Sequence, residues 1–282
     1  MLLNNKIRPL SRAGCDSEEP REAPTITYAS IHLLRQLIKR DVNARFTGSA
    51  LGLAWAILQP LSLLVLYWFV FTFMIPGGRL GLGATGRGES YLYFLIAGLV
   101  PWLGFNEGLQ RSASSMIDNA AIVRRLPLRR ELLVVVPTVS ALIFECVGLL
   151  LFILFIALTG ESLSGLWILP FALITQFALQ LGIGYWLAGL YVFFRDLMQV
   201  IGFALSILFY LSPILYPVGG RFEKLFFWNP LTALLGLFRS ALLSAPLPDA
   251  PSIVFLLVVT AAALVSGLVF FGRVQPTLVD LI

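Results

Sequence analysis

Long apolar runs separated by shorter polar segments make up most of this chain. The first run, residues 50–75, contains no charged side chain. About 20 such residues, each rising ~1.5 Å along a helix, cross the ~30 Å apolar layer of a bilayer. Further runs lie at about 91–112, 131–158, 166–194, 199–217 and 252–271. The pattern therefore predicts an all-α integral membrane protein with six transmembrane helices.

The segment before the first run, residues 28–46, has a different pattern. Apolar residues recur there at spacings of three and four, as on one face of a helix: Ile31, Leu34, Ile38 and Val42. Polar and basic residues fall on another face: His32, Arg35, Gln36, Lys39 and Asn43. We expect an amphipathic helix at the membrane interface, followed by a sharp turn at Gly48 and Gly52. A solvated positive flank is the alternative interpretation.

Before the last run, the apolar stretch 225–243 is long enough to be mistaken for a seventh span. Asn229 and Pro230 interrupt it, and a residue that precedes proline is disfavoured in a helix. Two short re-entrant helices that dip into the outer leaflet fit this stretch better than a crossing. Irregular backbone at such depth needs protein or water around it, so the segment is predicted to line the outer end of a pathway.

Composition and charge agree with a membrane protein and orient it. Hydrophobic residues make up 58% of the chain and charged residues 12%, against about a quarter charged in soluble domains. With six spans and the N-terminus inside, fifteen of the 20 lysines and arginines lie on the inner side. We expect a multi-pass protein of the cytoplasmic (inner) membrane with cytoplasmic N- and C-termini. The net charge of +5 therefore reflects topology and does not indicate a nucleic-acid partner.

The ends of the chain and its scarce reactive residues set further limits. Residues 1–27 lack the apolar core of a signal peptide and are expected to form a flexible cytoplasmic tail. Residues 28–275 would form the transmembrane domain, and 276–282 a cytoplasmic end. One histidine and two cysteines offer no metal site and no nucleophile–base pair, so a membrane-embedded enzyme is not favoured.

The loop at 116–130, MIDNAAIVRRLPLRR, is the strongest candidate for a working part on the cytoplasmic side. Met116, Ile117, Ala120 and Ile122 predict a short amphipathic helix, and Pro127 would end it. Four arginines would hold it at the membrane surface: Arg124, Arg125, Arg129 and Arg130. Such a helix could dock into a groove on a soluble partner. A charged topological anchor explains the same pattern equally well.

Two acids lie within the apolar runs, where an unpaired carboxylate costs several kcal/mol. Glu107 lies near the inner boundary, and Arg111 one turn later would pair with it. Glu145 lies deeper. It could carry protons in an ion-coupled transporter, or it could be a structural carboxyl that accepts hydrogen bonds.

Aromatic residues are numerous toward the outer side, and the candidates for a pore lining are Tyr67, Phe71, Tyr210 and Tyr216. Interfacial anchoring is the usual role of such residues. The alternative is a ring of flat apolar faces on which sugar rings could stack and slide.

Several segments together resemble the membrane subunit of type-2 ABC polysaccharide exporters, the permeases for O-antigen and teichoic acid. The likeness covers about 28–272 and rests on motifs in the same order: RDVNARFTGSALGLAWAILQP, GLVPWLGFNEGL, SMIDNAAIVRRLPLRREL, FRDLMQV, SPILYPV and WNPLTALLGLFRSALL. The resemblance implies six spans, an interface helix matching 31–46, a coupling helix matching 115–126 and re-entrant helices matching 216–243. The sequence RRLPLRR departs from the Lys-Lys-aromatic-Pro-Arg run expected of the family.

The resemblance also implies partners and roles. A homodimer would form a channel for a lipid-linked glycan, and two ATPase subunits would dock beneath it. Contact with the ATPases is assigned to Met116, Ile117, Asn119, Arg124, Arg125, Arg195 and Asp196. Arg35, Lys39, Arg40 and Arg45 would attract the pyrophosphate of the carrier lipid, although ordinary headgroups account for them equally well. This chain has no GxxxxGK[ST] loop, so ATP and Mg are expected on the partner, and no cofactor is expected here.

Three functions therefore compete on the sequence alone. The first is ATP-driven export of a lipid-linked, O-antigen-like polysaccharide. The second is a type-2 ABC exporter of a drug or lipid. The third, of a different class, is an ion-coupled carrier that uses Glu145.

Overall fold

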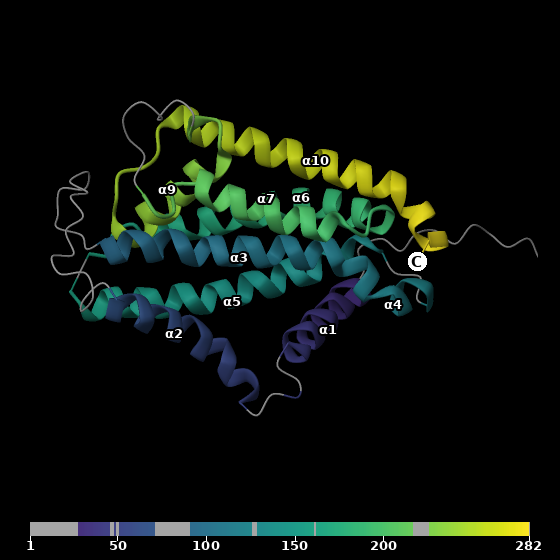
Figure 1. The fold of residues 1–282 in the computed structure, drawn as a ribbon, viewed down its shortest axis with the longest axis horizontal. Helices are drawn as coiled ribbons and strands as arrows, with labels where there is room; N and C mark the ends of the chain where they lie inside the picture. The colour runs from purple at the N-terminus through teal and green to yellow at the C-terminus, as the bar shows by residue number, and fades with distance from the viewer. Residues whose placement is uncertain are drawn as a thin grey trace, which may run out of the picture.

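The computed structural model describes residues 28–45, 48, 51–70, 91–125, 129–160, 162–216 and 226–281. Within these ranges every regular element is a helix, which confirms the all-α class. The long helices lie lengthwise in one bundle, and α1 and α2 lie along the α5 side of it (Figure 1). The elements are α1 (Tyr28–Ala44), η1 (Gly52–Ala54), α2 (Trp55–Phe69), α3 (Tyr91–Asp118), α4 (Ala120–Arg125), α5 (Glu131–Leu158), η3 (Leu166–Ile168), α6 (Leu169–Phe193), α7 (Leu197–Leu211), α9 (Pro230–Leu243) and α10 (Ala250–Leu281).

Four helices in the described ranges are long and apolar enough to cross a membrane: Tyr91–Asp118, Glu131–Leu158, Leu166–Phe193 and Ala250–Gln275. Each coincides with one of the predicted apolar runs. The runs at 50–75 and 199–217 correspond to shorter apolar helices, α2 and α7. Residues 71–75 of the first run lie outside the described residues, so the number of six spans stays a prediction.

The bundle has two chemically different ends. At one end Arg130, just before α5, donates a hydrogen bond of 3.0 Å to the Gln275 carbonyl of α10. At the other end the Tyr91 hydroxyl donates to the Leu215 carbonyl at 2.7 Å, and Ser164 and Ser244 share a 2.9 Å hydrogen bond. At the first end lie α1, α4 and the α6–α7 connection, all of which contain arginine (Figure 1). We therefore call it the basic end. We call the opposite end the outer end, after the side on which the sequence predicts it.

The amphipathic helix forms as predicted, but its apolar face packs on protein. Leu37 is buried, and Leu33, Leu34 and Ile38 pack against a cluster that includes Met116 and Val134. α5 covers part of this face, and the placement of the helix at the membrane interface stays a prediction. The turn that follows is confirmed. Gly48 and Gly52 have φ of 86° and 50°, a conformation that residues with a Cβ rarely adopt.

As predicted, the stretch 225–243 is interrupted and does not form one continuous helix. Asn229 caps α9, since its side-chain oxygen accepts a 3.0 Å hydrogen bond from the Leu231 N–H, and Pro230 takes the first helical position. The helix ends at Ser244, whose φ of 53° is left-handed. With 14 residues, α9 is too short to span a bilayer.

Glycine allows α6 and α10 to pack closely. A Cβ at Gly267 would lie 2.2 Å from the Gly182 carbonyl oxygen, and a Cβ at Gly182 would lie 2.5 Å from the Ala263 carbonyl carbon. Both clashes are with backbone, which cannot rotate away. Small residues of this kind let transmembrane helices approach closely in the absence of a hydrophobic driving force.

We predict that Gly267→Leu destabilises the protein, because the backbones of α6 and α10 must then separate. The cost is about 1–3 kcal/mol or more, the range for overpacking a close contact. The measurement is thermal unfolding of the purified protein in detergent. Gly272→Leu is the matched control, since a Cβ at Gly272 of the same helix meets nothing within 4 Å. Equal melting temperatures for the two variants would contradict the packing argument.

Candidate functional site

A row of alternating charges fastens α1 to α3 at the basic end. Arg45 donates to both carboxylate oxygens of Glu107, one of these bonds measuring 2.9 Å. Arg111 donates to the two carboxylate oxygens of Asp41 at 2.8 and 2.7 Å. Arg111 also lies 3.7 Å from Glu107, so the predicted pair one turn apart is confirmed. The stronger partner of Glu107, Arg45, was not foreseen because it is 62 residues away.

Arg45 thereby belongs to the protein interior more than to the lipid surface. Its guanidinium also lies 4.1 Å from the centre of the Phe144 ring of α5, a cation–π contact. The Arg45 side chain, one residue beyond the end of α1, therefore contacts both α3 and α5. The ion pair with Glu107 is of the strong kind, because an arginine that donates two hydrogen bonds to one carboxylate is held more tightly than one that donates a single bond, particularly when the pair is partly removed from water.

The other basic residues assigned to headgroups are placed differently. Arg35 and Lys39 are exposed on α1. Arg40 is also exposed, and it donates a 2.8 Å hydrogen bond to the Asn119 side-chain oxygen. Of the four predicted lipid contacts, Arg35 and Lys39 thus keep outward-facing side chains, whereas Arg40 and Arg45 contact protein.

The predicted coupling segment consists of two pieces. The long helix α3 runs on through Met116 and Ile117 to Asp118, and α4 begins at Ala120. Asn119 stands at the break, where its side chain donates a 2.9 Å hydrogen bond to the Ser115 carbonyl. The single helix predicted for 115–126 is therefore wrong at this residue. Pro127 lies outside the described residues.

Exposure separates the residues assigned to partner contact. Met116 is fully buried in the cluster under α1, so in this conformation it supports the segment from within. Ile117 is 36% exposed. Arg124 and Arg125 are the last two residues of α4. Arg195 and Asp196 are exposed in the α6–α7 connection.

The segment around Asn119 and the α6–α7 connection lie at the same end of the bundle. Gln176 donates to the Pro101 carbonyl at 3.4 Å, and Gln180 donates to the Gly104 carbonyl at 2.9 Å. Residue numbers thus rise together along α3 and α6, so the two helices are parallel. The break at Asn119 and the connection at Arg195 therefore both lie at the basic end (Figure 1).

Glu145 is buried in the middle of the bundle. The Gln176 side chain donates a hydrogen bond to one carboxyl oxygen, and the other oxygen has no partner among the described residues. A Cβ at Gly104 would lie 2.1 Å from the bonded oxygen, so glycine makes the room for this carboxyl. A cavity of about 200 Å³ beside it is also lined by Arg45 and Glu107. The contacts are those of a carboxyl that joins α3, α5 and α6.

The four predicted pore aromatics do not form one continuous group among the described residues. The Tyr216 hydroxyl donates to the Tyr210 carbonyl, and the Tyr216 ring lies edge to face with Phe226, 5.9 Å between centres. Tyr67 is half-buried against the main core. Phe71 lies outside the described residues.

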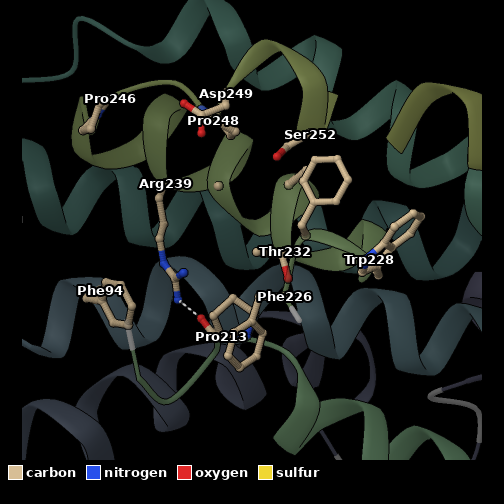
Figure 2. A pocket seen from close by; sticks show the side chains of 13 residues that line it. Phe94, Pro213, Phe226, Trp228, Thr232, Arg239, Pro246, Pro248, Asp249 and Ser252 are labelled. Atoms are coloured by element: carbon tan, nitrogen blue, oxygen red, sulfur yellow. Dashed lines mark hydrogen bonds between the residues drawn. The ribbon is translucent and has the colours of Figure 1, made fainter. Parts of the chain in front are cut away.

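Arg239, which is buried within α9, was not among the site residues predicted from the sequence. Its guanidinium donates to the Pro213 carbonyl at 2.6 Å and lies 3.6 Å from the centre of the Phe94 ring (Figure 2). A Cβ at Gly98 would lie 2.8 Å from the same guanidinium, so α3 also makes room for it. The available signal was a lone charged residue within a mostly apolar 14-residue helix.

Comparison with known proteins identifies the family of this chain. Residues 32–243 match the family model described as ABC-2 type transporter. The chain is 29% identical over 223 residues to the O-antigen export system permease protein RfbA of Klebsiella pneumoniae, covering 76% of this chain and 82% of that protein. It is 25% identical over 243 residues to RfbA of Myxococcus xanthus, covering 82% and 88%. The polysialic acid transport protein KpsM of Escherichia coli is 24% identical over 241 residues, covering 83% and 90%.

The matched region contains α3, α5, α6 and α9, and with them Glu107, Glu145 and Arg239. It begins within α1 and ends with the last residue of α9. The match thus includes most of the helices at both ends of the bundle and stops before α10, and this chain belongs to the ABC-2 type transporter family.

Proposed function

We propose that this chain is the transmembrane subunit of an ATP-driven exporter that carries a lipid-linked polysaccharide across the cytoplasmic membrane. The single observation that carries this proposal is the match over more than three quarters of the chain to permeases named for O-antigen and polysialic acid transport. The motif order of the sequence supports it. The substrate is a glycan of the O-antigen type, and export of a drug or lipid is the second candidate.

The proposed topology has six spans. Four are the long apolar helices, and α2 and α7 supply the other two. The short helix α9 is re-entrant at the outer end and does not cross. The basic end faces the cytoplasm, together with both termini, because arginine and lysine are enriched on that side of inner-membrane proteins.

The proposed assembly is a homodimer with two ATPase subunits. ATP and Mg bind to those subunits, since the chain has no phosphate-binding loop. Ile117, Asn119, α4 and the Arg195–Asp196 connection form the docking surface at the basic end. When the ATPases close, this surface moves, and the charge row carries the displacement from α3 into α1. The glycan enters beside α1 and leaves past α9.

The decisive test is deletion of the gene in its own organism. Surface polysaccharide should disappear and lipid-linked polysaccharide should accumulate inside, with both reversed by the restored gene. Unchanged surface polysaccharide, together with accumulation of a drug or lipid, would favour the second candidate. The purified complex should contain an ATPase subunit, and an active protein without one would overturn the proposal.

Truncation of Ile117 should uncouple the transporter from its ATPase. In Ile117→Ala we expect surface polysaccharide to fall several-fold and stimulated ATP turnover to fall with it, because an exposed apolar contact at the docking surface is lost. The matched control is Ile207→Ala on α7. This isoleucine is also exposed, at 43%, but it lies away from the basic end. Equal ATP turnover in both variants would count against docking at Ile117.

The basic residues of α1 should separate into two groups. The double variant Arg35→Gln, Lys39→Gln should reduce export without a change in melting temperature, because both side chains are exposed and available to lipid phosphates. Arg45→Gln should lower the melting temperature, since it leaves the part-buried Glu107 without its closest partner. A double-mutant cycle between Arg45 and Glu107 measures the coupling, and a coupling energy of zero would refute the structural role.

Replacement of the mid-bundle acid distinguishes the ATP-driven proposal from an ion-coupled carrier. Glu145→Gln should retain most of the export, because the amide fills the same space and its oxygen still accepts from Gln176. Surface polysaccharide of the variant strain is the measurement. Complete loss of transport in a normally folded and normally abundant variant, with no ATPase partner present, would favour proton coupling.

A further inference from the structure

A cavity of about 700 Å³ opens at the outer end, where α9, the start of α10 and the start of α3 meet. Figure 2 shows Asp249 and Ser252 on the α10 side and Phe94, Pro213 and Phe226 on the other, with Arg239 and Thr232 of α9 between them. We call this cavity the outer pocket. Its volume falls within the range of about 300–1,000 Å³ that is typical of pockets for small ligands.

One face of α9 is built toward the outer pocket. Thr232, Gly236 and Arg239 are four and three residues apart, so they lie on the same side of the helix, and all three line the cavity. The glycine is required there, since a Cβ at Gly236 would lie 2.6 Å from Pro248. Most of the other residues of α9 are apolar and buried in the core. The face of α9 that carries Thr232 and Arg239 therefore lines the pocket, whereas its other faces pack in the core.

Two polar atoms of this face have no hydrogen-bond partner within the described part of the chain. They are the Arg239 Nε and the Thr232 hydroxyl. Arg239 is 9% exposed, and its only described hydrogen bonds go from one terminal nitrogen to the carbonyls of Pro213 and Ile214. Thr232 lies in the first turn of α9, where no carbonyl of the same helix precedes it by four residues. Buried polar groups are normally paired, and these two belong to residues that line the pocket, where a ligand could supply the partner.

The remaining walls suit a flat ring with hydroxyl groups. Phe227 and Trp228 lie edge to face, and both lie within 5.7 Å of Phe255 between ring centres. Trp228 is 68% exposed. Among the described residues that line the pocket, one is a cation, Arg239, and one is an exposed carboxylate, Asp249. An acidic group would meet both an attractive and a repulsive charge, whereas hydroxyls both donate and accept hydrogen bonds.

We infer that the outer pocket binds an uncharged sugar unit of the polysaccharide as it leaves the transporter. The inference rests on the proposed function and deepens it by assigning a contact for the substrate. The sugar ring stacks on the aromatic wall, and its hydroxyls pair with Arg239 Nε, the Thr232 hydroxyl and the Asp249 carboxylate. The site lies between α9 and the first turn of α10, so a bound sugar would contact both helices.

Photo-crosslinking in cells that make the polysaccharide tests this inference. A benzophenone amino acid replaces Phe227 in the full transporter, and illumination should shift the subunit to a band that stains for glycan. Val258 of α10, which is 60% exposed and does not line the pocket, provides the control position. No glycan should attach there. A second label at position 249 examines the opposite wall.

A matched pair of variants tests the hydrogen bonds. Thr232→Val removes the hydroxyl with little change of shape, and the glycan crosslink from position 227 should fall about 2- to 10-fold, the loss expected for one hydrogen bond. Thr260→Val is the control. It makes the same change at a threonine that is also buried without a partner in the described residues, but outside the pocket.

The outcomes separate the two proposals. Normal export without a glycan crosslink at either 227 or 249 would overturn the outer pocket and leave the exporter intact. A crosslink that Thr232→Val does not weaken would overturn the assigned hydrogen bonds. Surface polysaccharide that does not depend on this gene would overturn both.

Discussion

The bundle depends on side-chain amides of α6 that bond directly to the backbone of α3. Gln176 and Gln180 reach the carbonyls of Pro101 and Gly104, and Gln176 also holds the carboxyl of Glu145. In an apolar bundle each of these polar groups costs free energy unless it finds a partner within the protein. Glycine is what permits the approach, since a Cβ at Gly104 or Gly108 would overlap Glu145 or Gln180. Polar bonding and close packing therefore determine the same helix–helix geometry.

This geometry leaves the two ends free to differ. At the basic end, the alternation of Arg45, Glu107, Arg111 and Asp41 joins an interface helix to a spanning helix by partly exposed charges. At the outer end, Arg239 is held by neutral carbonyls and an aromatic ring. Partly hydrated ion pairs can exchange partners at small cost, whereas a buried cation held by carbonyls is expensive to release. The basic end is thus suited to movement, and α9 is suited to keep its place.

Periodicity and length predicted what depends on local sequence. The long apolar helices, the turn at Gly48 and the break at Asn229 and Pro230 follow from residue-level preferences, and the structure confirms them. Contacts between distant residues were not predictable in this way. The apolar face of α1 has the pattern of a lipid-facing helix, and no local signal tells lipid from the surface of α5. Arg45 and Glu107 are 62 residues apart, and Arg239 gains its partners only when α9 folds back on Pro213.

The helix α3 connects these separate features. It carries Glu107 and Arg111 at the basic end, Gly104 beside Glu145 in the middle, and Phe94 against Arg239 at the outer end. Pro101 interrupts its hydrogen bonding between the middle and the outer end, and a helix bends most easily where a proline removes a bond. A displacement at the basic end therefore meets a compliant point before it reaches α9. Motion of the inner half of α3 can rearrange the charge row while the outer half stays anchored to Arg239.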